Sequence, residues 1–283
     1  MKEYIVTQRA NATTKTGSPY ANIKVANLDE IINVAVWDLA PAQQPVVGQI
    51  VSFYAMKGDE GKKSCNRADV KVGPMPDETH PLYGLIPRPI TRDVWDKTLQ
   101  HLVGYCTDEG LVAIIQDFGA KLYRPYSEYP AATTVHHAFQ GGLLNHTHQL
   151  LTMLDGIYPV LPYPVKIERC ILAILFHDYG KVYEYTHSGE ATQDMFLLGH
   201  IYIGAHKLHN ELEKQGIPDE EIKRIVHCVL AHHGTREFGS PVLPCTQEAE
   251  LVNHLDELSA KFDSIEHTGH MEKSFALGTT VVK

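Results

Sequence analysis

The sequence lacks the features of a membrane-spanning, secreted or disulfide-bonded protein. Its 283 residues are 43% hydrophobic, but no apolar run reaches the roughly 18 residues that a membrane-spanning helix needs. The first nine residues have no apolar segment of the kind found in signal peptides. The five cysteines are odd in number and widely spaced, without a Cys-x-x-Cys pair, which argues against a disulfide framework or a cysteine zinc site. We therefore expect a cytoplasmic protein with no membrane partner.

The chain also lacks the surplus of positive charge that is typical of proteins binding polyanions. Its formal net charge is −9, and the charge is unevenly distributed. Residues 1–72 carry nine Lys and Arg against seven Asp and Glu, whereas residues 73–283 carry sixteen against twenty-seven. An acidic body repels nucleic acid unless bound cations reverse the sign locally.

The pattern of the first 72 residues predicts a small β-barrel. Alternating apolar and polar positions and turn residues predict five short strands, with a loop at residues 58–64, and the expected strands are residues 4–7, 20–26, 31–37, 48–55 and 68–72. So many short strands favour an OB-fold. On such a barrel, Tyr20 and Trp37 can stack bases and Lys24 can lie near a strand backbone. Burial in the barrel core is the commoner role for any single aromatic residue of this kind.

The rest of the chain reads as helical. Residues 73–90 form a proline-rich linker, residues 91–265 an all-α domain and residues 266–283 a weakly patterned tail. No alternation of strands and helices predicts a parallel α/β sheet. A segment rich in Tyr and Pro, residues 123–130, is expected to be a loop between helices at residues 109–118 and 140–154. The remaining expected helices are residues 93–99, 165–176, 199–215, 219–232 and 247–262.

Histidine is the residue type that stands out in the helical region. Thirteen of the 17 histidines fall between His136 and His254. Seven residues with apolar flanking segments are candidate metal ligands: His146, His177, Asp178, His200, His232, His233 and Asp256. A lone buried histidine is more often a hydrogen-bonded core residue, but burying this whole set without metal would be costly. One ion takes about four ligands, so the set suggests two ions sharing a carboxylate.

Lys181 follows the adjacent His177-Asp178 pair by about one helical turn. At that spacing its ammonium group can reach a phosphate that a metal ion holds. The pair, the lysine and the other candidate ligands occur within five recognisable segments of the chain: residues 136–147, 177–181, 198–204, 232–241 and 246–256, the last followed by Ala260-Lys261.

These segments resemble the HD-domain metal-dependent phosphohydrolase superfamily, and more specifically the YhaM-type 3′→5′ exoribonucleases. Members of that family also carry an N-terminal OB-type domain, so the resemblance covers nearly the whole chain. It implies a β-barrel followed by an α-helical HD domain. It further implies hydrolysis of single-stranded RNA with a free 3′ end to nucleoside 5′-monophosphates, with single-stranded DNA as a second polymer, by a hydroxide that two metals activate. A ring-like homo-oligomer is also suggested.

The resemblance assigns roles to the candidate residues. His146, His177, Asp178 and Asp256 would hold one ion, and Asp178 would bridge to a second. The second ion would be held by His200 and by His232, His233 or both. Manganese is the expected metal, with iron, cobalt, nickel and zinc as alternatives. Four further residues would act on the substrate: Lys181 on phosphate charge, His137 as a proton donor or a structural hydrogen-bonding residue, and His136 as a binding residue. The fourth, Arg236, would lie at the substrate entrance or form a surface salt bridge.

Three other functions use the same residues. An HD phosphohydrolase of free or cyclic nucleotides needs the same ligands but has no need of a strand-binding barrel. A two-iron oxygenase on this scaffold does not explain Lys181. An adaptor that binds single strands through the barrel, with a vestigial metal site, does not explain why the ligand set is intact.

Overall fold

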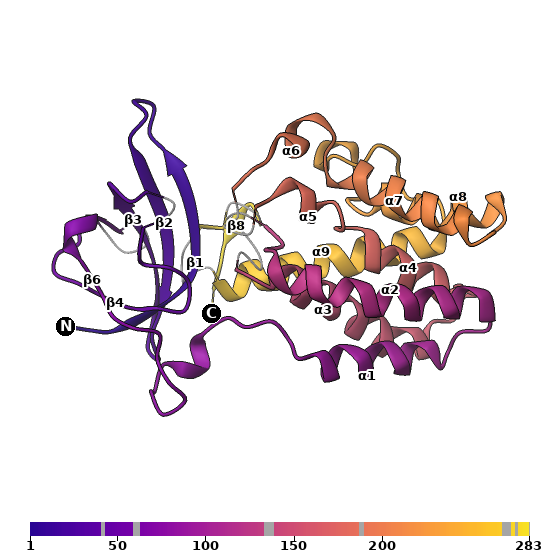
Figure 1. Cartoon of the computed structure of the whole chain (residues 1–283), viewed down its shortest axis with the longest axis horizontal. Coiled ribbons are helices and arrows are strands. Elements are labelled where there is room, and N and C mark those ends of the chain that lie inside the picture. The colour runs from indigo at the N-terminus through magenta and orange to yellow at the C-terminus, as the bar shows by residue number, and fades with distance from the viewer. Residues whose placement is uncertain are drawn as a thin grey trace.

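The computed structural model describes residues 1–40, 43–58, 63–132, 139–186, 190–267, 273–274 and 277–282. A β-sheet unit forms one end of the molecule and a helical unit forms the other (Figure 1). Within the described ranges, no helix combines the length and the apolar character needed to cross a membrane.

The β unit is a six-stranded sheet that closes into a barrel-like shape. Its strands are β1 (Tyr4–Thr13), β2 (Pro19–Ala26), β3 (Ile31–Trp37), β4 (Ile50–Phe53), β5 (Lys63–Asn66) and β6 (Val70–Val72). They pair in the order β5-β3-β2-β1-β4-β6, and β5 runs parallel to β3. The two edge strands follow one another in the chain through the short turn Arg67–Asp69, so the sheet is nearly closed. The predicted OB-fold-like barrel is confirmed.

The barrel interior follows the period-two pattern of its strands. Val6, Ile23, Val25, Val34 and Val36 are all buried there, because alternate side chains of a strand face the same side of the sheet.

The prediction of a loop at residues 58–64 was wrong for its last two residues, because Lys63–Asn66 form strand β5. This segment has little intrinsic strand preference. It is a strand because it pairs with β3 and turns Cys65 into the core.

The expected linker packs against the barrel. Leu82 forms a small buried cluster with Ile5 of β1 and Ile50 of β4. The division into residues 1–72, 73–90, 91–265 and 266–283 stays a prediction. Two of its boundaries fall close to structural ones, since the first helix begins at Arg92 and the last runs to His267.

The helical unit is built around one short, almost fully buried helix. Its elements are α1 (Arg92–Val103), α2 (Glu109–Glu128), α3 (Gly142–Ile157), α4 (Ile167–Phe176), α5 (Lys181–Glu184), α6 (Gln193–Leu197), α7 (His200–Lys214), α8 (Asp219–Ala231) and α9 (Gln247–His267). Every residue of α4 except Arg169 is buried, as expected of a helix that neighbours surround on all sides. The tail adds two-residue strands β7 (Lys273–Ser274) and β8 (Thr279–Thr280).

One expected loop in this unit is helical. Residues 123–130 were predicted to be irregular, but α2 continues through Pro125 to Glu128. The buried Tyr126 explains the continuation, because its hydroxyl donates a hydrogen bond to the carbonyl of Leu175 on α4. Packing against α4 therefore outweighs the low helix propensity of proline.

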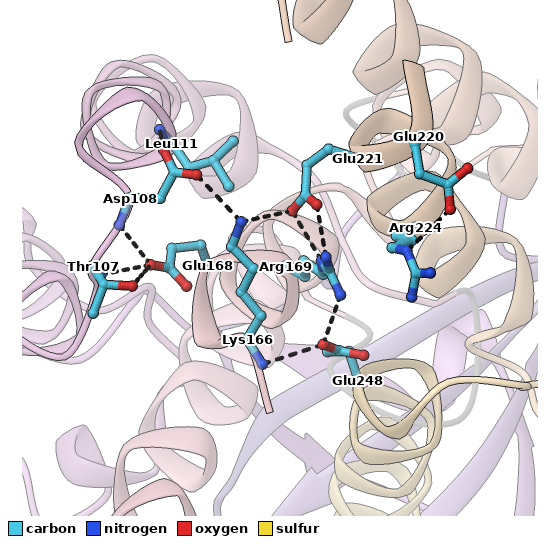
Figure 2. Close-up of polar contacts among 10 residues, drawn as sticks. All are labelled: Thr107, Asp108, Leu111, Lys166, Glu168, Arg169, Glu220, Glu221, Arg224 and Glu248. Atoms are coloured by element: carbon cyan, nitrogen blue, oxygen red, sulfur yellow. Dashed lines mark hydrogen bonds and ion pairs between the residues drawn. The ribbon is translucent and has the colours of Figure 1, made fainter. Parts of the chain in front are cut away.

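The first residues of α4 are held by a network of charged side chains (Figure 2). The buried Glu168 carboxylate accepts hydrogen bonds from the backbone N–H groups of Thr107 and Asp108, at 2.6 and 3.0 Å. Arg169 donates two hydrogen bonds to Glu221 on α8, at 2.9 and 2.7 Å, and one to Glu248 on α9 at 3.1 Å. The network therefore ties α4 to three neighbouring segments, and α4 leads directly into the His177-Asp178 pair.

We expect Arg169→Ala to lower the free energy of unfolding by about 2 kcal/mol, because it leaves the nearly buried Glu248 carboxylate without a cationic partner and Glu221 with Lys166 alone. That loss corresponds to a decrease in Tm of about 5 °C, measurable by circular dichroism. Arg224→Ala is the matched control, since its ion pair with Glu220 is largely exposed and exposed pairs contribute little. Equal decreases in the two variants would contradict the structural role of the network.

Candidate metal centre

The first cluster of candidate ligands lies where three helices meet. His177 directly follows α4, His146 comes from α3 and Asp256 from α9. His146 Nε2 lies 3.1 Å from His177 Nε2 and 3.0 Å from Asp256 Oδ1. Ligand atoms of the three residues all fall within 4.8 Å of one another, which is close enough for one ion to bind them together.

The second cluster consists of three histidines. His200 is the first residue of α7, and His232 and His233 directly follow α8. Their candidate ligand atoms also lie within 4.8 Å of one another. Each ring of the pair at the end of α8 is oriented by a backbone carbonyl. His232 Nδ1 donates to Val229 O at 2.6 Å, and His233 Nδ1 donates to Phe238 O at 2.7 Å. These bonds leave both Nε2 lone pairs available for an ion.

Asp178 lies between the two clusters. Its Oδ2 is 3.6 Å from His146 Nε2 and 3.3 Å from His177 Nε2. Its Oδ1 is 3.7 Å from His200 Nε2. One carboxylate therefore presents one oxygen to each cluster, which is the arrangement that a carboxylate bridging two ions requires.

Three buried atoms of the centre indicate that the clusters fit a cation. Among the described residues, Asp178 Oδ1, His200 Nε2 and His232 Nε2 have no hydrogen-bond partner. Buried polar atoms are nearly always satisfied, so each such atom calls for an explanation. A divalent ion on imidazole nitrogens and carboxylate oxygens would satisfy them, and this donor set suits manganese, iron, cobalt, nickel and zinc.

The protonation states also favour metal binding. Burial lowers the pKa of His232 well below its ordinary value, and burial likewise lowers the pKa of His233. Both rings are therefore neutral near pH 7, which is the form that binds metal. Burial alone would raise the pKa of Asp178, but the ammonium of Lys181 and the ring of His177 outweigh it, and the pKa lies well below its usual range.

Lys181 contacts the carboxylate that lies between the clusters. Its Nζ is 2.7 Å from Asp178 Oδ2, and the side chain is only 10% exposed. Burial would lower the pKa of Lys181, but the neighbouring Asp178 carboxylate raises it above its ordinary value. The site therefore keeps one fixed positive charge beside the candidate ligands.

Two residues that orient the ligands were missed by the sequence analysis. Glu184 on α5 accepts hydrogen bonds from both the backbone N–H and Nδ1 of His200. Ser259 on α9 donates to Gln149 at 2.9 Å and lies 3.0 Å from His146 Nδ1, from which its oxygen can accept. Such partners fix the ring orientation of a histidine ligand. No spacing signal points to them, because they reach the site only after α5 and α9 have packed.

Two glycines allow α7 to approach the His-Asp turn closely. A Cβ atom on Gly180 would lie 2.3 Å from the Cα of His200, and one on Gly204 would lie 2.5 Å from the carbonyl oxygen of Phe176. Either distance is a steric clash, so any larger residue would push His200 away from Asp178.

A cavity of 520 Å³ opens beside the second cluster. Its walls include the centre itself, the loop that follows α8 and one face of α9: Asp178, Lys181, His232, His233, Gly234, Thr235, Phe238, Asn253, His254, Asp256, Glu257, Ala260, Lys261 and Ser264. The volume falls within the usual range for small-molecule sites.

The structure places the other predicted site residues as follows. His136 and His137 lie outside the described residues. Arg236 is exposed in the loop after His233, where Thr235 and Phe238 line the cavity. Tyr20 and Trp37 are register partners on β2 and β3, with ring centroids 4.9 Å apart.

Lys24 lies four residues after Tyr20 on β2, so it faces the same side of the sheet. Trp37 of the neighbouring strand is 39% exposed there. The three residues thus share one outer face of the barrel, and their binding role stays a prediction.

Comparison with known proteins agrees with this centre. The HD domain family matches residues 143–261, which contain all seven candidate ligands. No solved structure matches the chain significantly.

Curated relatives carry the name 3'-5' exoribonuclease YhaM. The protein of Geobacillus sp. (strain WCH70) is 28% identical over 258 residues, covering 88% of this chain and 78% of the relative. The protein of Bacillus pumilus (strain SAFR-032) is 33% identical over 196 residues, covering 65% and 61%. The protein of Bacillus subtilis (strain 168) is 26% identical over 274 residues, covering 93% and 85%. The chain is therefore similar to HD domains over residues 143–261 and to the YhaM proteins over most of its length, at modest identity.

Proposed function

We propose that this protein is a 3′→5′ exonuclease that shortens single-stranded RNA and releases nucleoside 5′-monophosphates. The observation that carries the proposal is the position of Asp178, with one carboxylate oxygen toward each ligand cluster. The match to the HD domain family and the similarity to the curated relatives support a metal-dependent hydrolase of phosphodiester bonds. The name shared by these relatives supports the direction of cleavage and the choice of RNA.

The match to the HD domain family implies dependence on a divalent metal. We propose that the centre binds two ions and that the metal is manganese. His146, His177 and Asp256 would hold one, the three histidines of the second cluster would hold the other, and Asp178 would contact both. When bound, such ions supply an activated water molecule and neutralise phosphate charge. Lys181 adds a fixed positive charge from a nearly buried position, where it can neutralise a non-bridging phosphate oxygen.

The barrel supports a polymer as the substrate. A strand needs a surface outside the catalytic centre, and Tyr20, Trp37 and Lys24 offer stacking faces and a positive charge on one side of the sheet. Residues 73–283 carry more acidic than basic side chains, so the bound cations would supply the positive charge that attracts the 3′ end of the strand. Single-stranded DNA as a second substrate, cytoplasmic location and assembly of several copies stay predictions.

The test is product analysis on single strands labelled at the 5′ end. With Mn²⁺ present, RNA should shorten stepwise from its 3′ end and nucleoside 5′-monophosphates should accumulate. A blunt duplex of the same sequence should resist, because its terminal phosphodiester cannot reach a nearly buried centre. DNA of the same sequence tests the choice of polymer. Hydrolysis of free or cyclic nucleotides without any shortening of strands would contradict the proposal.

A further inference from the structure

The cavity extends past the metal centre, and its outer part has no role so far. The lining of this part includes Thr235 and Phe238, from the loop after α8, and a face of α9 with Glu257, Ala260 and Lys261. At 520 Å³ the cavity has room for much more than ions and one phosphate group.

Phe238 presents an aromatic ring in this outer part. Phe238 lines the cavity and is 70% exposed. A single exposed aromatic residue is ordinary on a protein surface. This one differs in its position, because it lies five residues after a candidate metal ligand, at the cavity that contains that ligand.

Hydrogen bonds hold the main chain at Phe238 in place. The carbonyl of Phe238 accepts the hydrogen bond from His233 Nδ1 at 2.7 Å. The N–H of Phe238 donates to Thr235 O at 3.2 Å, and Ser240 N–H donates to the same carbonyl at 3.1 Å. The main chain of Phe238 is therefore tied to a histidine of the second cluster, which keeps this residue close to the metal centre.

Three polar side chains of the α9 wall are already engaged. Lys261 Nζ pairs with Glu257 Oε1 at 2.7 Å, and Asn253 Nδ2 donates to His232 O at 2.6 Å.

An enzyme that removes successive nucleotides must accept every base at one position. An apolar ring suits this need, because every base has a face that can stack and no hydrogen-bond pattern is read.

We propose that Phe238 is the stacking platform for the base of the 3′-terminal nucleotide, which makes the outer cavity a nucleoside subsite. The inference rests on the proposed exonuclease function and names a specificity residue for it. The terminal nucleotide would place its phosphodiester at the metal centre and its base on the ring. Recognition would then be of a base as such, with little preference among the four.

The test compares two single strands that differ only at the 3′ end, one with a normal terminal nucleotide and one with an abasic residue. For the wild-type protein with Mn²⁺, kcat/KM should be about tenfold lower on the abasic end, because base stacking is lost. Phe238→Ala should lower kcat/KM on the normal end about tenfold and leave the abasic end unchanged. Phe238→Trp should restore the preference for a base.

Phe196→Ala is the matched control, because Phe196 is 78% exposed on α6 and is not among the cavity-lining residues. It should change neither rate. The metal content of Phe238→Ala should equal that of the wild type, because the substitution keeps the backbone carbonyl that orients His233. A protein that shortens strands but treats both ends alike overturns the stacking inference and leaves the exonuclease function standing. The same holds if Phe238→Ala slows both ends equally. Failure to shorten any strand defeats the proposed function itself.

Discussion

Asp178→Asn should lower the rate of nucleotide release by at least about 10³-fold, the equivalent of roughly 4 kcal/mol in the activation barrier. Asparagine keeps the size of the side chain but removes the negative charge that lies between the ligand clusters. The one remaining amide oxygen can serve only one ion, as a neutral ligand, and Lys181 would lose its carboxylate partner at 2.7 Å. The measurement is kcat on single-stranded RNA at saturating Mn²⁺.

A control must separate loss of chemistry from loss of fold. Asp219→Asn makes the same substitution at an exposed position of α8 and should retain full activity. Circular dichroism and Tm report whether Asp178→Asn is folded. If the unpaired Lys181 unfolds that variant, Asp256→Asn offers a second test, because Asp256 lies in the first cluster only. A folded Asp178→Asn protein with activity within about tenfold of the wild type would contradict the bridging role.

Removal of metal should abolish hydrolysis completely. Dialysis against a chelator leaves the buried nitrogen and oxygen atoms of the centre without a cation, among them His200 Nε2 and Asp178 Oδ1, which have no hydrogen-bond partner among the described residues. Mn²⁺ should restore the rate. Because ions that bind the native state alone stabilise it, Tm should fall on chelation and recover with the activity. Hydrolysis that persists in the metal-free protein would refute metal dependence.

The number of ions is a sharper test of the same centre. Metal analysis of the saturated wild-type protein should give two ions per chain. His146→Ala and His200→Ala each remove one ligand from a different cluster, so each should weaken the binding of at least one ion. His206→Ala is the matched control, since this histidine is exposed on α7, the helix that begins with His200. A single ion per chain at saturation would contradict the proposal of two.

Two segments differ from the structure that their local sequence predicts. Residues 63–66 have little intrinsic strand preference and became β5 through pairing with β3. Residues 123–128 contain Pro125 but are helical, because Tyr126 is buried and donates a hydrogen bond to α4. In both segments, contacts with distant parts of the chain outweighed local propensity.

The candidate ligands could be identified from the sequence for a related reason. Each has apolar neighbours in its own segment, and helices that bury those neighbours also bring the polar residue inward. The order of the ligands along the chain carries the resemblance to HD proteins. The partners that orient the rings could not be identified this way, because Ser259 lies 113 residues from His146 and has no pattern of its own.

The sequence by itself determined the barrel, the helical domain and the seven candidate ligands, because these follow from periodicity and from residue type. The resemblance implies two groups of ligands joined by Asp178, and the tertiary structure supplied the distances that place them so. Only the tertiary structure decided that Glu184 orients His200. It also decided that Phe238, rather than Arg236, lines the cavity. Distances between side chains on α3, α4, α7, α8 and α9 depend on how these helices pack, and packing is a property of the whole domain that no local spacing encodes.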